Sequence, residues 1–108
     1  MKTEEVYYRL AFSQIKGVGP VRFKKVVEAV NDTSLIFTAK RKFLKYELGL
    51  PESVVQEIIT KRDFKEIDLE MNYVTKNNIQ ILFFDEINYP NHLNHCLDGP
   101  PFIFYKGK

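Results

Sequence analysis

Apolar residues at the start of the chain recur three or four positions apart. In residues 4–14, EEVYYRLAFSQ, this spacing gives a helix one apolar face. Gly17 is a typical helix stop, and Pro20 suits the first position of a second helix because its missing N–H would be unpaired there. The apolar positions expected to face inward on that second helix are Val21, Phe23, Val26, Val27 and Val30. The pattern predicts two helices joined by a tight turn.

A second, similar arrangement follows in the middle of the chain. The polar stretch at residues 31–34 predicts a turn. Short helices are expected over residues 34–39 and 42–48, the latter ending at Gly49. A longer helix then begins near Pro51, in LPESVVQEIITKR, with its valines and isoleucines inward. The two glycine turns lie about 30 residues apart, so we expect two related helical hairpins packed as a pair.

The pattern changes after residue 63. The stretch DFKEIDLEMNYVTKNN predicts a helix with Ile67, Met71 and Val74 inward, and IQILFFD then predicts a buried strand. A short helix is expected within YPNHLNHCLDG and a second buried strand over residues 102–105, giving a βαβ-like unit. Because two strands alone make a poor sheet, we expect this part to begin a larger α/β domain and the chain to be a piece of a longer protein.

These elements predict a mainly α helix-hairpin-helix domain over residues 1–63, followed by a small α/β segment over residues 64–108. The apolar fraction of 44% and charged fraction of 28% are ordinary for a soluble globular protein. A single cysteine, Cys96, excludes an internal disulfide and favours a reducing compartment. We find neither a signal peptide nor the roughly 18 apolar residues that span a bilayer. We therefore expect a cytoplasmic protein without a membrane partner.

The turn of the first hairpin, IKGVG at residues 15–19, has the form of a helix-hairpin-helix motif. Gly17 permits a positive φ, Gly19 lets the backbone approach a bulky anion, and Val18 is expected to point into the core. The turn would present the amides of Gly17, Gly19 and Val21 at the positive end of the second helix, which suits a phosphate.

Basic side chains surround this turn, with no acidic residue between Lys16 and Lys25. Backbone amides together with Lys and Arg bind sugar-phosphate without reading bases, so binding would be sequence-independent and salt-sensitive. The net charge of +2 does not by itself indicate nucleic-acid binding, and the alternative is a structural turn with a solvated basic face. We favour DNA contact. The candidate residues are Lys16, Gly17, Val18, Gly19, Val21, Arg22, Lys24 and Lys25.

The second hairpin differs in charge. Its turn carries one glycine, with Glu47 and Glu52 beside it and Glu57 further on. Because acidic residues at a helix N-terminus repel phosphate, we expect this hairpin to be structural. Its acidic face leaves open an alternative function, that of a protein–protein interaction module with no direct DNA contact.

Other chemistry-bearing residues carry no prediction of a site. His92, His95 and Cys96 have the spacing of one helix face, but a metal site would need a further ligand such as Asp98. We expect a surface helix there instead. Asp85 and Glu86 end the first strand without a nucleophile or histidine partner. We therefore predict no catalytic residues, no metal and no cofactor, and expect the protein not to be an enzyme.

Two stretches resemble one known family. LAFSQIKGVGPVRFKKVV and then KNNIQILFFDEINYPNHLNHCLDGPPFIFYKGK are similar, in this order, to the N-terminal part of the DprA/Smf family of DNA-processing proteins. The second stretch is the more specific, with NYP followed by a leucine and then D-x-PP-x-x-x-Y-x-KG, which resembles the entry into that family's Rossmann-like domain. The resemblance covers nearly the whole chain.

The resemblance implies a function and partners. Proteins of this family bind single-stranded DNA during natural transformation and help to load the recombinase RecA onto it. The helical part would be a SAM-like or helix-hairpin-helix domain, and the α/β segment would begin a Rossmann-like domain. The main single-strand-binding and RecA-binding surfaces would lie in the part of that domain after Lys108, and the full-length protein would be a homodimer. What carries over to this chain is the first hairpin, Lys16 to Lys25, in an accessory role.

Overall fold

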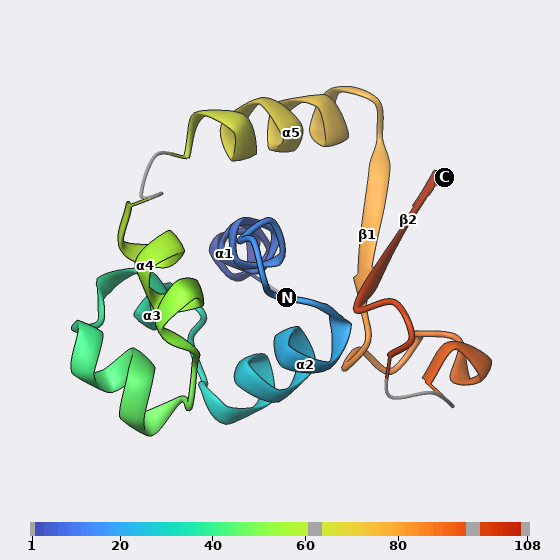
Figure 1. The fold of residues 1–108 in the computed structure, drawn as a ribbon. Coiled ribbons are helices and arrows are strands. Elements are labelled where there is room, and N and C mark those ends of the chain that lie inside the picture. Colours follow the sequence, from blue (N-terminus) through green and yellow to red (C-terminus); the bar gives the residue numbers. More distant parts are fainter. Residues whose placement is uncertain (1, 61–63, 95–97, 107–108) are drawn as a thin grey trace.

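The computed structural model describes residues 2–60, 64–94 and 98–106, which form a mainly helical structure with one small sheet (Figure 1). The helices are α1 (Thr3–Ser13), α2 (Pro20–Ala29), α3 (Ser34–Thr38), the π-helix η1 (Phe43–Glu47), α4 (Glu52–Thr60), α5 (Lys65–Lys76) and the 3-10 helix η2 (Asn91–Asn94). The strands are β1 (Ile79–Phe83) and β2 (Phe102–Lys106). The predicted helical part followed by a small α/β segment is confirmed. The expected domain boundary at residue 63 lies outside the described residues.

Helix α1 lies at the centre of the molecule, and it contacts α2, α3 and α5 (Figure 1). Four consecutive residues of α1, from Arg9 to Phe12, are buried, because neighbours cover this helix on several sides. Leu10 and Phe12 belong to a core that also includes Val55 on α4. The amphipathic spacing therefore places α1 correctly, but it underestimates how much of the helix is enclosed.

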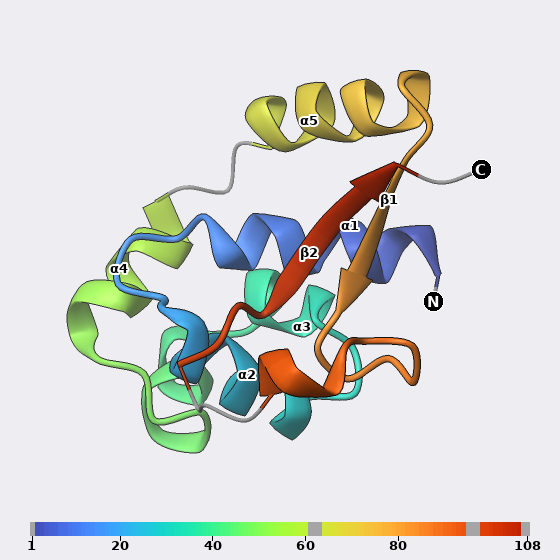
Figure 2. The same cartoon turned by 90° about the vertical axis from the view of Figure 1, so that its right-hand side faces the viewer.

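One hydrophobic core joins the helical part to the α/β segment. The ring of Phe23 on α2 lies 5.8 Å from that of Phe12, 6.4 Å from that of Phe83 and 6.3 Å from that of Phe102, measured between centroids. Phe23 and Phe83 are essentially fully buried. Figure 2 shows the two strands side by side, with α1 behind them. The side chains of α2 and β1 therefore pack into the same interior.

A buried arginine adds a polar link between these two parts. Arg9 on α1 is 7% exposed, and its two terminal nitrogens each donate to one oxygen of Asp85 at 2.7 Å. Its Nε donates to Glu5 at 2.8 Å, and Glu5 also accepts hydrogen bonds from the amide and hydroxyl of Thr33. The Arg9 guanidinium also lies 5.0 Å from the ring centroid of Phe83. Burial opposes the charge, but the hydrogen bonds to the two carboxylates outweigh it and raise the pKa of Arg9.

The strands correct one prediction: they are antiparallel, with Ile79 opposite Lys106 and Phe83 opposite Phe102, so they do not form a βαβ-like unit. A parallel pair needs a crossover element that runs back along the strands, and η2 is a single short turn. The second strand is also not buried, because about half of Phe104 and Tyr105 is exposed. An antiparallel pair can keep one face in solvent.

Two further expectations on the helical part need correction. The helix expected over residues 42–48 contains a π-helical turn, in which the amide of Leu48 donates to the carbonyl of Phe43 at 3.1 Å. Val21 was expected to face inward but is exposed, because it lies in the first turn of α2, beyond the part of that helix that meets the core. Hydrophobic spacing alone could not show that residues 43–47 form a π-helical turn or that Val21 is exposed.

Candidate nucleic-acid interface

The turn of the first hairpin depends on Gly17. Its φ of +93° lies in the region that favours glycine, as the motif predicts. A Cβ at this position would lie 2.9 Å from Cγ2 of Val54, so the turn also approaches α4 closely. Val18 packs, partly buried, against the core, which agrees with its expected inward position. The backbone shape and the contact with the second hairpin both require a glycine here.

Gly19 has a different role. It caps α2 in extended conformation, and a Cβ placed on it would meet no atom within 4 Å. Its carbonyl accepts the first hydrogen bond of α2, from the amide of Phe23 at 2.9 Å. Within the described ranges the amides of Gly19, Val21 and Arg22 have no hydrogen-bond acceptor. The turn therefore leaves an open surface with N–H donors at the positive end of a helix.

We expect Gly17→Ala to lower the free energy of unfolding by about 1–3 kcal/mol, because alanine at this φ is strained and its Cβ would press on Val54. The matched variant, Gly19→Ala, should lower stability less, by about 0.5 kcal/mol, because its Cβ meets no atom and the remaining cost is that alanine is a poorer N-cap than glycine. Urea unfolding of the two variants measures the difference. Equal losses would contradict the different roles of the two glycines.

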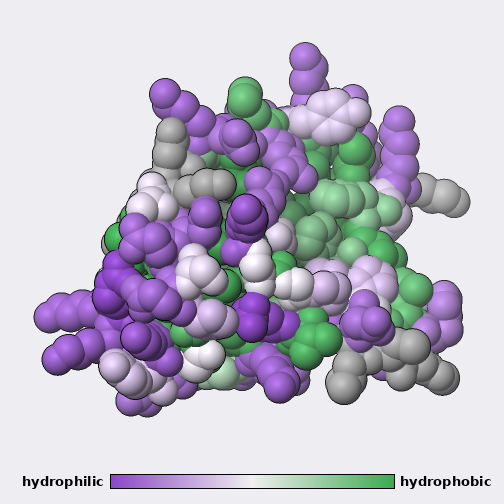
Figure 3. All heavy atoms as spheres, viewed as in Figure 1, coloured by the Kyte–Doolittle hydropathy of each residue, from purple (hydrophilic) through white to green (hydrophobic). Residues whose placement is uncertain are grey.

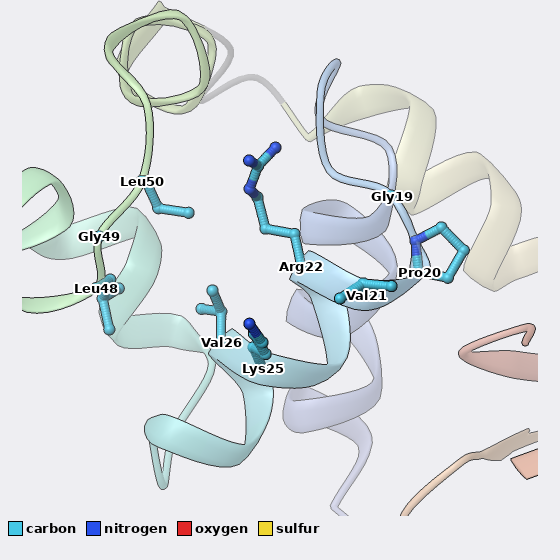
Figure 4. Close-up of a pocket in the computed structure, with 9 residues that line it drawn as sticks. All are labelled: Gly19, Pro20, Val21, Arg22, Lys25, Val26, Leu48, Gly49 and Leu50. Carbon is cyan, nitrogen blue, oxygen red and sulfur yellow. The ribbon is translucent and has the colours of Figure 1, made fainter. Parts of the chain in front are cut away.

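A groove of about 440 Å³ lies between the turns of the two hairpins, and we call it the hairpin groove (Figure 4). Residues 19–21 form one side and residues 48–50 the other, while Arg22, Lys25 and Val26 of α2 lie between them (Figure 4). The chain reverses at Gly49 with a φ of +66°. The pairing of two hairpins, expected from the repeat, thus builds the groove.

The side chains that line the hairpin groove include two cations and no carboxylate. The Arg22 side chain extends between the two turns, and its Nη1 donates to the carbonyl of Gly17 (Figure 4). Lys25 is exposed. The groove is therefore lined by two cations and by a turn whose amides have no acceptor in the part of the chain that the structure describes, an arrangement suited to an anion.

The structure separates the other predicted basic residues from this groove. Lys24 extends toward the α/β segment, where its Nζ lies 5.8 Å from the ring centroid of Phe84. Lys16 is exposed beside the turn and does not line the groove. Of the four predicted cations, Arg22 and Lys25 thus line the same groove as residues 19–21. Charge spacing along the sequence did not distinguish these two pairs.

Comparison with known proteins gives one match. No family model matches the chain, and no solved structure matches it. The chain is similar over all of its 108 residues to Protein Smf of Synechocystis sp., with 29% identity. It spans 27% of the length of that protein. The resemblance to the DprA/Smf family is confirmed.

The second hairpin contributes two leucines and the turn at Gly49 to the groove, and no charge (Figure 4). Glu52, at the start of α4, forms an ion pair with Arg41 and another with Lys45, whose Nζ lies 3.4 Å away. Neither Glu47 nor Glu52 lines the hairpin groove. Sequence reasoning missed residues 48–50 as part of the site because it compared the hairpins by charge. The repeat itself was the signal that could have placed both turns together.

The remaining chemistry-bearing residues form no site in the described part of the chain. Asp85 binds Arg9, and Glu86 accepts a hydrogen bond from the amide of Phe83 at 2.7 Å, so both carboxylates hold the end of β1. His92 is exposed, while His95 and Cys96 lie outside the described residues. Among the residues described, no group of three or more His, Cys, Asp or Glu could hold a metal ion, and no helix could cross a membrane.

Proposed function

We propose that this chain is a nucleic-acid-binding part of a DNA-processing protein of the DprA/Smf kind, and that the hairpin groove contacts the sugar-phosphate backbone of single-stranded DNA. The observation that carries the proposal is that Arg22 and Lys25 line the same groove as Gly19 and Val21, whose amides have no acceptor among the described residues. The similarity to Protein Smf supports a role in DNA processing. Assistance to RecA loading during natural transformation is proposed for the whole protein, of which this chain would be an accessory module.

The chemistry of the groove fits phosphate better than bases. Amide N–H groups and a lysine recognise anionic oxygens, and neither reads the pattern of donors and acceptors on a base edge. Gly19 leaves space for a phosphate to approach the backbone, because it has no side chain there. Binding should therefore be independent of sequence and should weaken as salt concentration rises, since condensed cations are released from the strand.

The test is a salt titration with labelled oligothymidylate, followed by fluorescence anisotropy. We expect the logarithm of the binding constant to fall linearly with the logarithm of salt concentration. Lys25→Gln should reduce that slope by about 0.7, the value for one phosphate contact on a single strand. Gly19→Asp should weaken binding more strongly, because it places a carboxylate where the phosphate would approach.

Lys76→Gln provides the matched control. It removes the same charge from an exposed position on α5, on the opposite side of the molecule from α2 (Figure 1). Its slope should equal that of the unmodified chain. Equal effects of the two substitutions, or no binding at low salt, would refute phosphate contact in the hairpin groove.

Protein binding is the second candidate function. It is favoured by two exposed apolar side chains, Leu35 on α3 and Phe43 on η1, which are 46% and 37% exposed. Apolar side chains that gather on a surface often mark a site where another protein binds.

A further inference from the structure

An apolar groove of about 550 Å³ lies over α3 and η1, apart from the hairpin groove. We call it the α3–η1 groove. Its lining is mostly apolar and includes the exposed parts of Leu35 and Phe43, with Ala39 between them in the sequence. The residues that line it are Leu35, Thr38, Ala39, Lys40, Lys42 and Phe43. A hollow with this lining can receive an apolar side chain from a partner.

Two lysines border this groove. No acidic residue occurs between Ser34 and Tyr46, although this stretch holds four basic ones. Arg41 and Lys45 form ion pairs with Glu52, whereas Lys40 and Lys42 have no ion-pair partner among the described residues. Hydrophilic side chains gather at the lower left of Figure 3, where Figure 1 places the segment before α4. The groove is thus apolar inside and positively charged at its rim.

We propose that the α3–η1 groove binds an acidic protein segment that inserts an apolar side chain, with carboxylates on either side of that anchor. The apolar lining would bury the anchor, and Lys40 and Lys42 would attract the carboxylates. Charge complementarity therefore sets the choice of partner.

The lining favours a peptide over a nucleic acid. Contact with the bases of a single strand, unlike contact with its sugar-phosphate backbone, relies on aromatic side chains on which successive bases stack. Leu35 and Ala39 are aliphatic, and Phe43 is the one aromatic side chain of the lining. A hollow with a single aromatic side chain accommodates a leucine or phenylalanine side chain better than it supports a stack of bases.

The probe for this proposal is a synthetic acidic peptide with one Phe and one Leu among Asp and Glu residues. We expect saturable binding by fluorescence anisotropy at low salt, with amide NMR shifts concentrated between Leu35 and Phe43. Lys40→Glu combined with Lys42→Glu should weaken binding by about tenfold or more, because the rim then repels the peptide. The control is Lys76→Glu combined with Lys106→Glu, which changes the net charge equally at exposed positions outside the groove.

Replacement of the peptide's Phe and Leu with Ser tests the apolar contact without altering the protein, and it should also abolish binding. Leu35→Ser should weaken binding in the same way, with the fold checked by circular dichroism. The proposal is overturned if the acidic peptide does not bind, if the control charge pair weakens it equally, or if the peptide without apolar anchors binds as well. Displacement of the peptide by oligothymidylate from this groove would assign it to nucleic acid and overturn it too.

Discussion

Replacing Arg9 with methionine will lower the free energy of unfolding by about 3 kcal/mol, at the lower end of the range for a broken buried ion pair. The substitution leaves the carboxylates of Glu5 and Asp85 without the cation that pairs with both. The cost falls at the lower end because 34% of the Asp85 side chain remains exposed to water. Urea unfolding followed by circular dichroism measures the change.

Arg41→Met is the control for this result. Arg41 also pairs with a glutamate, Glu52, but both side chains are about half exposed, so its loss should cost less than about 1 kcal/mol. A double variant, Arg9→Met with Asp85→Leu, should recover part of the stability, because it removes one of the two carboxylates left without a cation. Equal losses for Arg9→Met and Arg41→Met would contradict the importance of burial at Arg9.

Replacing Phe23 with alanine will lower the free energy of unfolding by about 3–5 kcal/mol, as expected when a large aromatic side chain leaves a cavity in a core. Phe23 is 1% exposed, and its ring contacts rings on α1 and on both strands. The loss should therefore affect the helical part and the α/β segment together. Hydrogen exchange detects this as lower protection of amides in both α2 and β1.

Phe23→Leu should cost clearly less, because leucine fills much of the same volume. If the alanine variant loses protection in α2 while β1 keeps its own, the two parts do not share a cooperative core. The result would then favour two independent units divided near residue 63.

Local signals explain why the first hairpin could be predicted. Gly17 and Pro20 act on the backbone at their own positions, through a positive φ and a fixed helix start, so they need no distant partner. Gly49 acts in the same way in the second hairpin. The positions of both glycine turns could be predicted for this reason.

The direction of the second strand depends on distant contacts, and the sequence did not predict it. Apolar runs indicate strands but not whether the chain returns antiparallel or crosses over. In the structure the loop between the strands is held by Tyr89, whose hydroxyl donates to the carbonyl of Pro100 at 2.6 Å. This hydrogen bond joins residues 11 positions apart, so neither apolar run indicates it.

The candidate site shows the same limit. Lys24 and Lys25 are neighbours in a basic run, yet one lies over Phe84 and the other borders the hairpin groove. Phe84 belongs to the α/β segment, so the spacing of charges along α2 cannot show that Lys24 and Lys25 lie at different surfaces. Arg9 was missed entirely, because a single arginine in an apolar helix resembles an ordinary exposed position. Its two carboxylate partners are separated from each other by most of the chain.

The core around Phe23 also sets how the hairpin groove is oriented relative to the two strands. Its neighbours on α2, Arg22 and Lys25, border the hairpin groove, while its own ring is held by β1 and β2. The core that holds the ring of Phe23 therefore joins the groove to the sheet. If the hairpin groove binds single-stranded DNA as proposed, this shared core would hold the bound DNA in one orientation relative to β1 and β2.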